Sequence, residues 1–170
     1  IANHYKWRTF QNAGVLSDIT IDFSLDERGS GATQAGARWG KKPYQQIFIP
    51  DKSGLFINNG NVDQKRVEEV IEIVSDALRN GKTVNIAGNE INKLSVMQDD
   101  INYQMELFFE EVKKKSDEPI TGKVISGGQT GFDEAGIIAA KKVFPGIETE
   151  VNYSSKTNKP PQLPAQSISE

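Results

Sequence analysis

The chain has 170 residues with a formal net charge of −3, and it contains one histidine, His4, and no cysteine. This length suffices for one domain with a buried core, and the acidic balance argues against a general nucleic-acid binder. Without cysteine there are no disulfides or thiolate metal sites, and one histidine argues against a His-based metal site or catalytic triad, so we predict no metal. No apolar run approaches the ~20 residues that cross a bilayer, so we expect a cytoplasmic protein without a membrane partner. The chain begins with Ile1, as a processed protein or a piece of a longer one would.

Residues 1–60 are predicted to form a β-rich N-terminal segment packed on the core. Residues 19–25 alternate apolar and polar side chains, which is typical of a half-buried strand, and residues 46–49 and 54–57 are two more short strand candidates. Residues 26–44 are rich in glycine and carry Arg38, so we predict a long loop. Such a loop either folds over an anionic ligand, with Arg38 gripping phosphate and Trp39 or Tyr44 stacking on a base, or is simply solvated.

Residues 61–152 alternate between helical and strand patterns and form the predicted core. Helices are expected from a capping box at 61–64 to a stop at 80–81, from a cap at 95–98 to the lysines at 113–115, and from residue 131 to about 144. Strands are expected at 83–89, 123–126 and 147–151. This alternation predicts an α/β fold with three layers and a mainly parallel sheet. Residues 153–170 are predicted to be an extended or disordered tail.

A turn of small residues follows the predicted strand at 123–126 and leads into a helix. The unpaired N–H groups and the dipole at a helix start favour an anion such as phosphate. In parallel sheets, ligands gather at the carboxyl ends of strands, which places Ala87-Gly88-Asn89 at the same edge. The alternative is a tight connection that binds nothing. The candidate ligand-binding residues are Gly88, Asn89, Gly127, Gly128, Gln129, Thr130, Gly131 and Arg38.

Residues 126–133, Ser-Gly-Gly-Gln-Thr-Gly-Phe-Asp, resemble the Ser-Gly-Gly-Gln-Thr-Gly-x-Asp motif of the molybdenum-cofactor carrier family. That family belongs to the SLOG group of Rossmann-like nucleotide-binding domains. The resemblance implies a Rossmann-like sheet whose glycine turn, residues 127–131, holds the phosphate of a nucleotide or molybdopterin-like cofactor, with Gln129 and Asp133 facing the ligand. In the carrier family the motif lies near the N-terminus. Here it comes late, so earlier segments must complete the sheet.

Three hypotheses about function follow. The first is a carrier, sensor or sequestering protein for a small nucleotide-type ligand. The second is a nucleotide N-glycosidic hydrolase in which Asp133 or Glu134 stabilises an oxocarbenium-like centre or activates water. The phosphoribohydrolases of the SLOG group use Gly-Gly-x-Gly-Thr-x-x-Glu, and Glu134 has the matching spacing, although the Gly-Thr order is inverted and no arginine segment matches. Both acids are also explained as partners of a helix dipole. The third is a structural component of a larger assembly or a homo-oligomer.

Overall fold

The computed structural model describes residues 4–153, so the predicted tail lies, from residue 154 on, outside the described residues. The elements in chain order are α1 (His4–Gly14), β1 (Ile19–Ser24), α2 (Gly31–Gly40), β2 (Tyr44–Phe48), α3 (Gln64–Arg79), β3 (Thr83–Gly88), the 3-10 turn η1 (Ile91–Lys93), α4 (Gln98–Lys114), β4 (Lys123–Ser126), α5 (Phe132–Val143) and β5 (Glu148–Val151).

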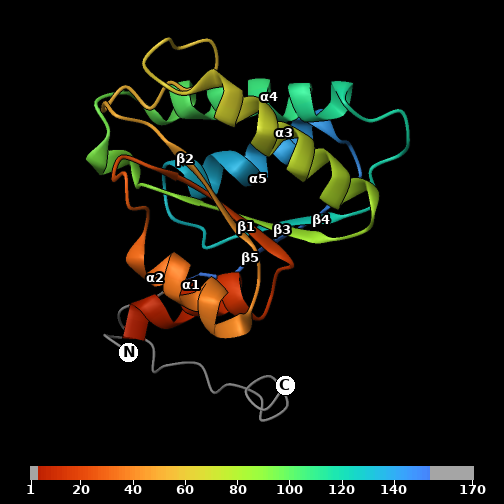
Figure 1. Cartoon of the computed structure of the whole chain (residues 1–170), viewed down its shortest axis with the longest axis horizontal. Helices are drawn as coiled ribbons and strands as arrows, with labels where there is room; N and C mark the ends of the chain where they lie inside the picture. Colours follow the sequence, from red (N-terminus) through yellow and green to blue (C-terminus); the bar gives the residue numbers. More distant parts are fainter. Residues whose placement is uncertain (1–3, 154–170) are drawn as a thin grey trace.

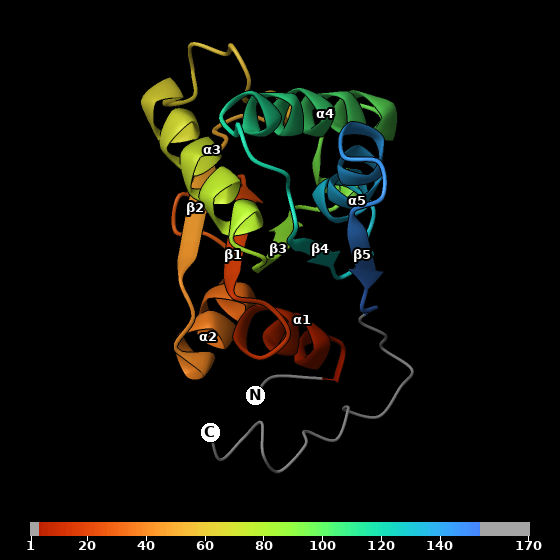
Figure 2. The same cartoon turned by 90° about the vertical axis from the view of Figure 1, so that its right-hand side faces the viewer.

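All five strands pair in parallel in the order β2-β1-β3-β4-β5. Helices α1 and α2 cover one face of the sheet, and α3, α4 and α5 cover the other (Figure 1, Figure 2). The predicted α/β, Rossmann-like three-layer fold is thus confirmed. Strands β1, β2 and β3, which come earlier in the chain than the glycine turn and its strand β4, make up the rest of the sheet together with β5. From β1 the chain moves outward to β2 and then crosses to the other side of β1 to form β3. The strand order therefore reverses between β1 and β3, which is where doubly wound sheets bind ligands.

Strand β1 is buried along its whole length, so the expectation of a half-buried strand is wrong. Phe23 packs against Phe108 of α4 and Phe132 of α5, with ring centroids 5.5 and 5.3 Å apart, so the apolar positions of β1 face that layer. The alternating polar positions, including Asp22, therefore face α1 and α2. A parallel sheet is covered by helices on both faces, which buries the polar positions too.

Residues 54–57 were expected to form a strand, and they do not. The backbone N–H groups of Phe56 and Ile57 donate instead to the side-chain oxygen Oε1 of Gln104, at 3.1 and 3.0 Å. Gln104 lies on α4, so one buried amide replaces the neighbouring strand that this apolar segment would otherwise need.

The predicted glycine-rich loop at 26–44 contains the helix α2, and α1 was not predicted. Ser30 caps α2 by accepting a hydrogen bond from the amide of Thr33. A Cβ at Gly36 would lie 2.8 Å from Cα of Phe10, and one at Gly40 would lie 2.6 Å from Cα of Gly14. These glycines let α1 and α2 pack backbone against backbone, so they mark a close helix contact rather than a loop.

From residue 61 on, the predicted helices and strands are confirmed, whereas the predicted caps are displaced. The N-cap of α3 is Asp63, whose carboxylate accepts from the amides of Lys65 and Arg66. The N-cap of α4 is Met97, and Asp100 accepts its backbone N–H at 3.0 Å. Neither Asn61 nor Ser95 caps a helix, because a nearer carboxylate serves each of these helix starts.

Candidate functional site

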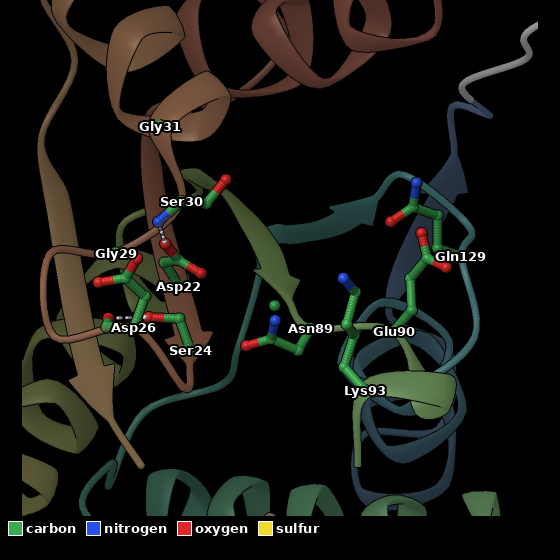
Figure 3. A pocket seen from close by; sticks show the side chains of 11 residues that line it. Asp22, Ser24, Asp26, Gly29, Ser30, Gly31, Asn89, Glu90, Lys93 and Gln129 are labelled. Atoms are coloured by element: carbon green, nitrogen blue, oxygen red, sulfur yellow. Dashed lines mark hydrogen bonds between the residues drawn. The ribbon is translucent and has the colours of Figure 1, made fainter. Parts of the chain in front are cut away.

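A cleft lies at the carboxyl edge of the sheet, where β1 and β3 end and α2 and α5 begin (Figure 3). It has two lobes of about 350 and 180 Å³, which share Ser30, Gly88, Glu90 and Gln129. The first lobe is also lined by Asp22, Ser24, Asp26, Gly29, Gly31, Asn89 and Lys93, and the second by Thr9, Ala32, Thr33, Ala87 and Asp133. The cleft thus occupies the point where the strand order reverses, and the two lobes together have the size of a small-molecule site.

Asp22 lies on β1 at the floor of the first lobe, with none of its surface exposed. Its Oδ2 accepts hydrogen bonds from the hydroxyl of Tyr44 and from the amide of Ser30, the latter at 2.8 Å. Burial raises the pKa of Asp22, and these two donors oppose the rise. Burial likewise raises the pKa of Tyr44, together with the charge of Asp22. The carboxyl of Asp22 is therefore fixed on one side by the start of α2 and by β2.

Asp133 lies in the first turn of α5 and lines the second lobe. Burial raises its pKa to about 8, and the nearby charge of Asp22 adds to the rise. The backbone amides of Gln129, Gly127 and Gly88 oppose it by hydrogen bonding to the carboxylate. At neutral pH, Asp133 therefore holds a proton that an ordinary aspartate has lost.

The glycine turn itself uses its N–H groups inside the protein. The amides of Gly127 and Gln129 serve Asp133, that of Gly128 donates to Oγ of Ser126 at 3.3 Å, and that of Gly131 donates to Oε1 of Gln98 at 2.6 Å. A Cβ at Gly128 would lie 2.5 Å from Cγ1 of Val151 and 2.6 Å from the ring of Tyr153. These glycines therefore serve internal packing and hydrogen bonding, and a larger residue at 128 would test stability rather than ligand binding.

Three of the predicted ligand-binding residues, Gly88, Asn89 and Gln129, do come together in the cleft. The side chain of Asn89 accepts the amide of Leu25 at 2.7 Å, which ties the end of β3 to the end of β1. Gln129 lines both lobes and points its amide toward the cleft (Figure 3). The two turns touch, because the amide of Phe132 donates to the carbonyl of Asn89 at 3.4 Å. The predicted neighbourhood of the two turns is thus confirmed.

Several other predicted site residues lie away from the cleft. Arg38 is exposed in the last turn of α2, whereas the cleft is at the first turn. Thr130 is exposed and Glu134 is half-buried, and neither lines either lobe. Trp39 packs on Phe10 of α1, with ring centroids 4.9 Å apart, so it is placed for helix packing rather than for stacking on a base. Arg38, the basic residue of α2, therefore does not line the cleft.

Sequence reasoning missed Asp22, Ser30, Glu90 and Lys93 as cleft residues. The available signal was Asp22 itself, a carboxylate among the apolar residues of a predicted strand. Ser30 was not recognised as a cleft residue, because residues 26–44 were predicted to be a loop. Its role as an N-cap follows only once a helix is known to start at residue 31. The start of α2 places the amides of Gly31 and Ala32 at the cleft, and no acceptor among the described residues takes either of them.

The fold and the cleft define a doubly wound α/β protein with a small-molecule-sized cleft at its switch point. No protein-family model matches the chain, and neither does a curated protein or a solved structure. Among the side chains that the structure describes, those of residues 7–153, no three acidic groups gather in a way that could hold a metal ion. No helix in that range is long and apolar enough to cross a membrane.

Proposed function

We propose that the protein binds a nucleotide or nucleotide-derived small molecule in the switch-point cleft, as a carrier, sensor or sequestering protein. The observation that carries this proposal is the position of the cleft. It lies at the carboxyl ends of β1 and β3, where the strand order reverses, and between the first turns of α2 and α5.

The phosphate belongs at the start of α2 rather than at the glycine turn 127–131. The amides of Gly31 and Ala32 lie in the first turn of α2, where the helix dipole favours an anion. Lys93 lines the first lobe together with Gly31, and no described carboxylate pairs with it. A Cβ at Gly31 would meet no atom within 4 Å, so the backbone is open to a ligand there. In this arrangement the glycine turn contributes Gln129 to the rest of the ligand.

Calorimetry with AMP, GMP, NAD, ADP-ribose and inorganic phosphate tests the proposal. The informative variant is Gly31→Asp, because a carboxylate suits the start of a helix but repels phosphate from it. We expect it to keep the wild-type melting temperature and to weaken nucleotide binding by about tenfold or more. Gly60→Asp is the matched control, since Gly60 also has no atom within 4 Å of a Cβ and does not line the cleft. If no compound binds the wild type, the proposal fails. Unchanged affinity in Gly31→Asp would place the phosphate elsewhere.

One observation favours a second candidate, hydrolysis of a nucleotide N-glycosidic bond. Asp133 has a pKa of about 8 and shares the cleft with a second buried carboxyl, that of Asp22. A protonated Asp133 would donate its proton to the departing base, and water would add its oxygen to the ribosyl carbon and return a proton to the carboxylate. Incubation with AMP or GMP and chromatography for free base test this candidate, with Asp133→Asn as the inactive control. Absence of free base from every nucleotide that binds would exclude it.

A further inference from the structure

One oxygen of Asp22 has no partner in the described part of the protein. Oδ2 accepts from Tyr44 and Ser30, whereas Oδ1 is buried and no described group forms a hydrogen bond with it. In Figure 3 the hydrogen-bonded oxygen points to Ser30, and the other oxygen points across the cleft to the side where Gln129 lies. A buried polar atom without a partner costs about 1–3 kcal/mol, so an unpaired carboxyl oxygen at the floor of a cleft needs an explanation.

The surroundings hold this oxygen in one orientation. Tyr44 extends from β2 and Ser30 from the start of α2, and both bond the opposite oxygen, so rotation of the carboxyl would break two hydrogen bonds. Gly29 has a φ of +79°, and a Cβ there would overlap the Tyr44 hydroxyl and lie 3.4 Å from Oδ2 of Asp22. The turn after β1 therefore leaves room for the hydrogen bond between Tyr44 and Oδ2 of Asp22. Because Oδ2 is held by this bond, Oδ1 points toward the cleft.

We propose that Asp22 recognises a hydroxyl group of the ligand, and in a nucleotide this is a hydroxyl of the ribose. The inference rests on the proposed function, because it assigns one part of that ligand to one residue. A hydroxyl both donates and accepts, so it pairs with Oδ1 whether the carboxyl is ionised or protonated. A phosphate oxygen, by contrast, only accepts and is repelled by the ionised form. The phosphate at the start of α2, beside Gly31, and the sugar at Asp22 would then lie side by side in the first lobe.

Calorimetry on the full chain with AMP and GMP, each beside its 2′-deoxy and 3′-deoxy counterparts, tests the inference. We expect the wild type to bind the ribonucleotide at least about tenfold more tightly than one of the two deoxy forms. Asp22→Ala should bring this ratio close to one, and Asp22→Asn should give an intermediate ratio because an amide still bonds a hydroxyl. Asp76→Ala is the matched control, because Asp76 lines neither lobe and pairs with Arg79 at the surface. It should leave the ratio unchanged.

The ratio of two affinities measured on one protein is insensitive to a general loss of stability, so a purely structural role of Asp22 would not move it. If Asp22→Ala does not fold, the wild-type ratio and Asp22→Asn still decide the matter. Equal binding of ribose and deoxyribose forms by the wild type would overturn the inference and leave the proposed function standing. So would a ratio in Asp22→Asn equal to that of the wild type. Failure of every nucleotide to bind would overturn both.

Discussion

Substitution of Gly131 is expected to cause a large loss of stability. It has a φ of +90° and a ψ of −132°, and it is the N-cap of α5. A Cβ there would overlap the carbonyl oxygen of Asn89 and lie 2.9 Å from the carbonyl carbon of Glu90, and both are backbone atoms that cannot rotate away. Positive φ and overpacking each cost about 1–3 kcal/mol. We therefore expect Gly131→Ala to lose about 3 kcal/mol, which lowers the melting temperature by roughly 6–12 °C for a chain of this length.

Gly31→Ala is the matched control for this substitution. Gly31 also begins a helix at the cleft, yet a Cβ there meets nothing within 4 Å. Alanine should be neutral or should stabilise α2 by up to about 1 kcal/mol. The melting temperatures of both variants and of the wild type are measured by circular dichroism. A melting temperature of Gly131→Ala within about 2 °C of the wild type would refute the internal packing role that we assign to the glycine turn.

Three further predictions concern the pH dependence and the helix starts. The folded protein keeps the proton of Asp133 up to about pH 8, whereas an unperturbed aspartate loses it at 3.8, so the free energy of unfolding should fall as the pH rises from about 4 to 8. Urea titrations at pH 5 and pH 8 should show a smaller fall in the free energy of unfolding for Asp133→Asn than for the wild type. An equal fall in the two proteins would contradict the buried proton. Gln98→Ala removes two hydrogen bonds to the backbone of Gly131, at 2.6 and 2.9 Å, and should cost about 1–3 kcal/mol in urea unfolding; unchanged stability would show that this link is dispensable. Asp63→Ala should cost about 1 kcal/mol as the loss of the α3 cap, while Asn61→Ala should cost nothing measurable, and the reverse order would restore the cap predicted from sequence.

The sequence predicted the fold well where hydrophobic periodicity and connection length agree. Helices α3, α4 and α5 and strands β3, β4 and β5 all follow from such patterns. Helix α2 was not predicted, because glycines at 36 and 40 indicate a loop when the local sequence is considered alone. Their role is to let the backbone of α2 pack against α1, which the local sequence does not show. The pairing of Gln104 with the backbone of residues 56 and 57 is invisible to local patterns too, because the partners are far apart in the chain.

Sequence reasoning predicted which edge of the sheet carries the cleft, but it did not predict most of the residues that line the cleft. The rule that ligands gather at the carboxyl ends of parallel strands brought Gly88, Asn89 and Gln129 together. It could not identify the switch point, because the sequence does not show that β1 lies between β2 and β3. The motif predicts that the glycine turn holds a phosphate, whereas the amides of Gly127 and Gln129 bond the carboxyl group of Asp133, which belongs to the same motif.

The starts of α2 and α5 both face the cleft, but they offer different chemical groups to a ligand. The two ends of the cleft therefore suit different parts of a ligand. At α5, the amides of Gly131, Phe132 and Glu134 all have acceptors inside the protein, and the carboxyl group of Asp133 accepts hydrogen bonds from the turn that precedes the helix. At α2, Asp22 takes only the amide of Ser30, and the amides of the next two residues remain open to the cleft. A ligand with one anionic end therefore gains more by turning that end toward α2. Its uncharged, hydrogen-bonding part then faces the protonated Asp133, which suits the sugar and base of a nucleotide better than a second phosphate.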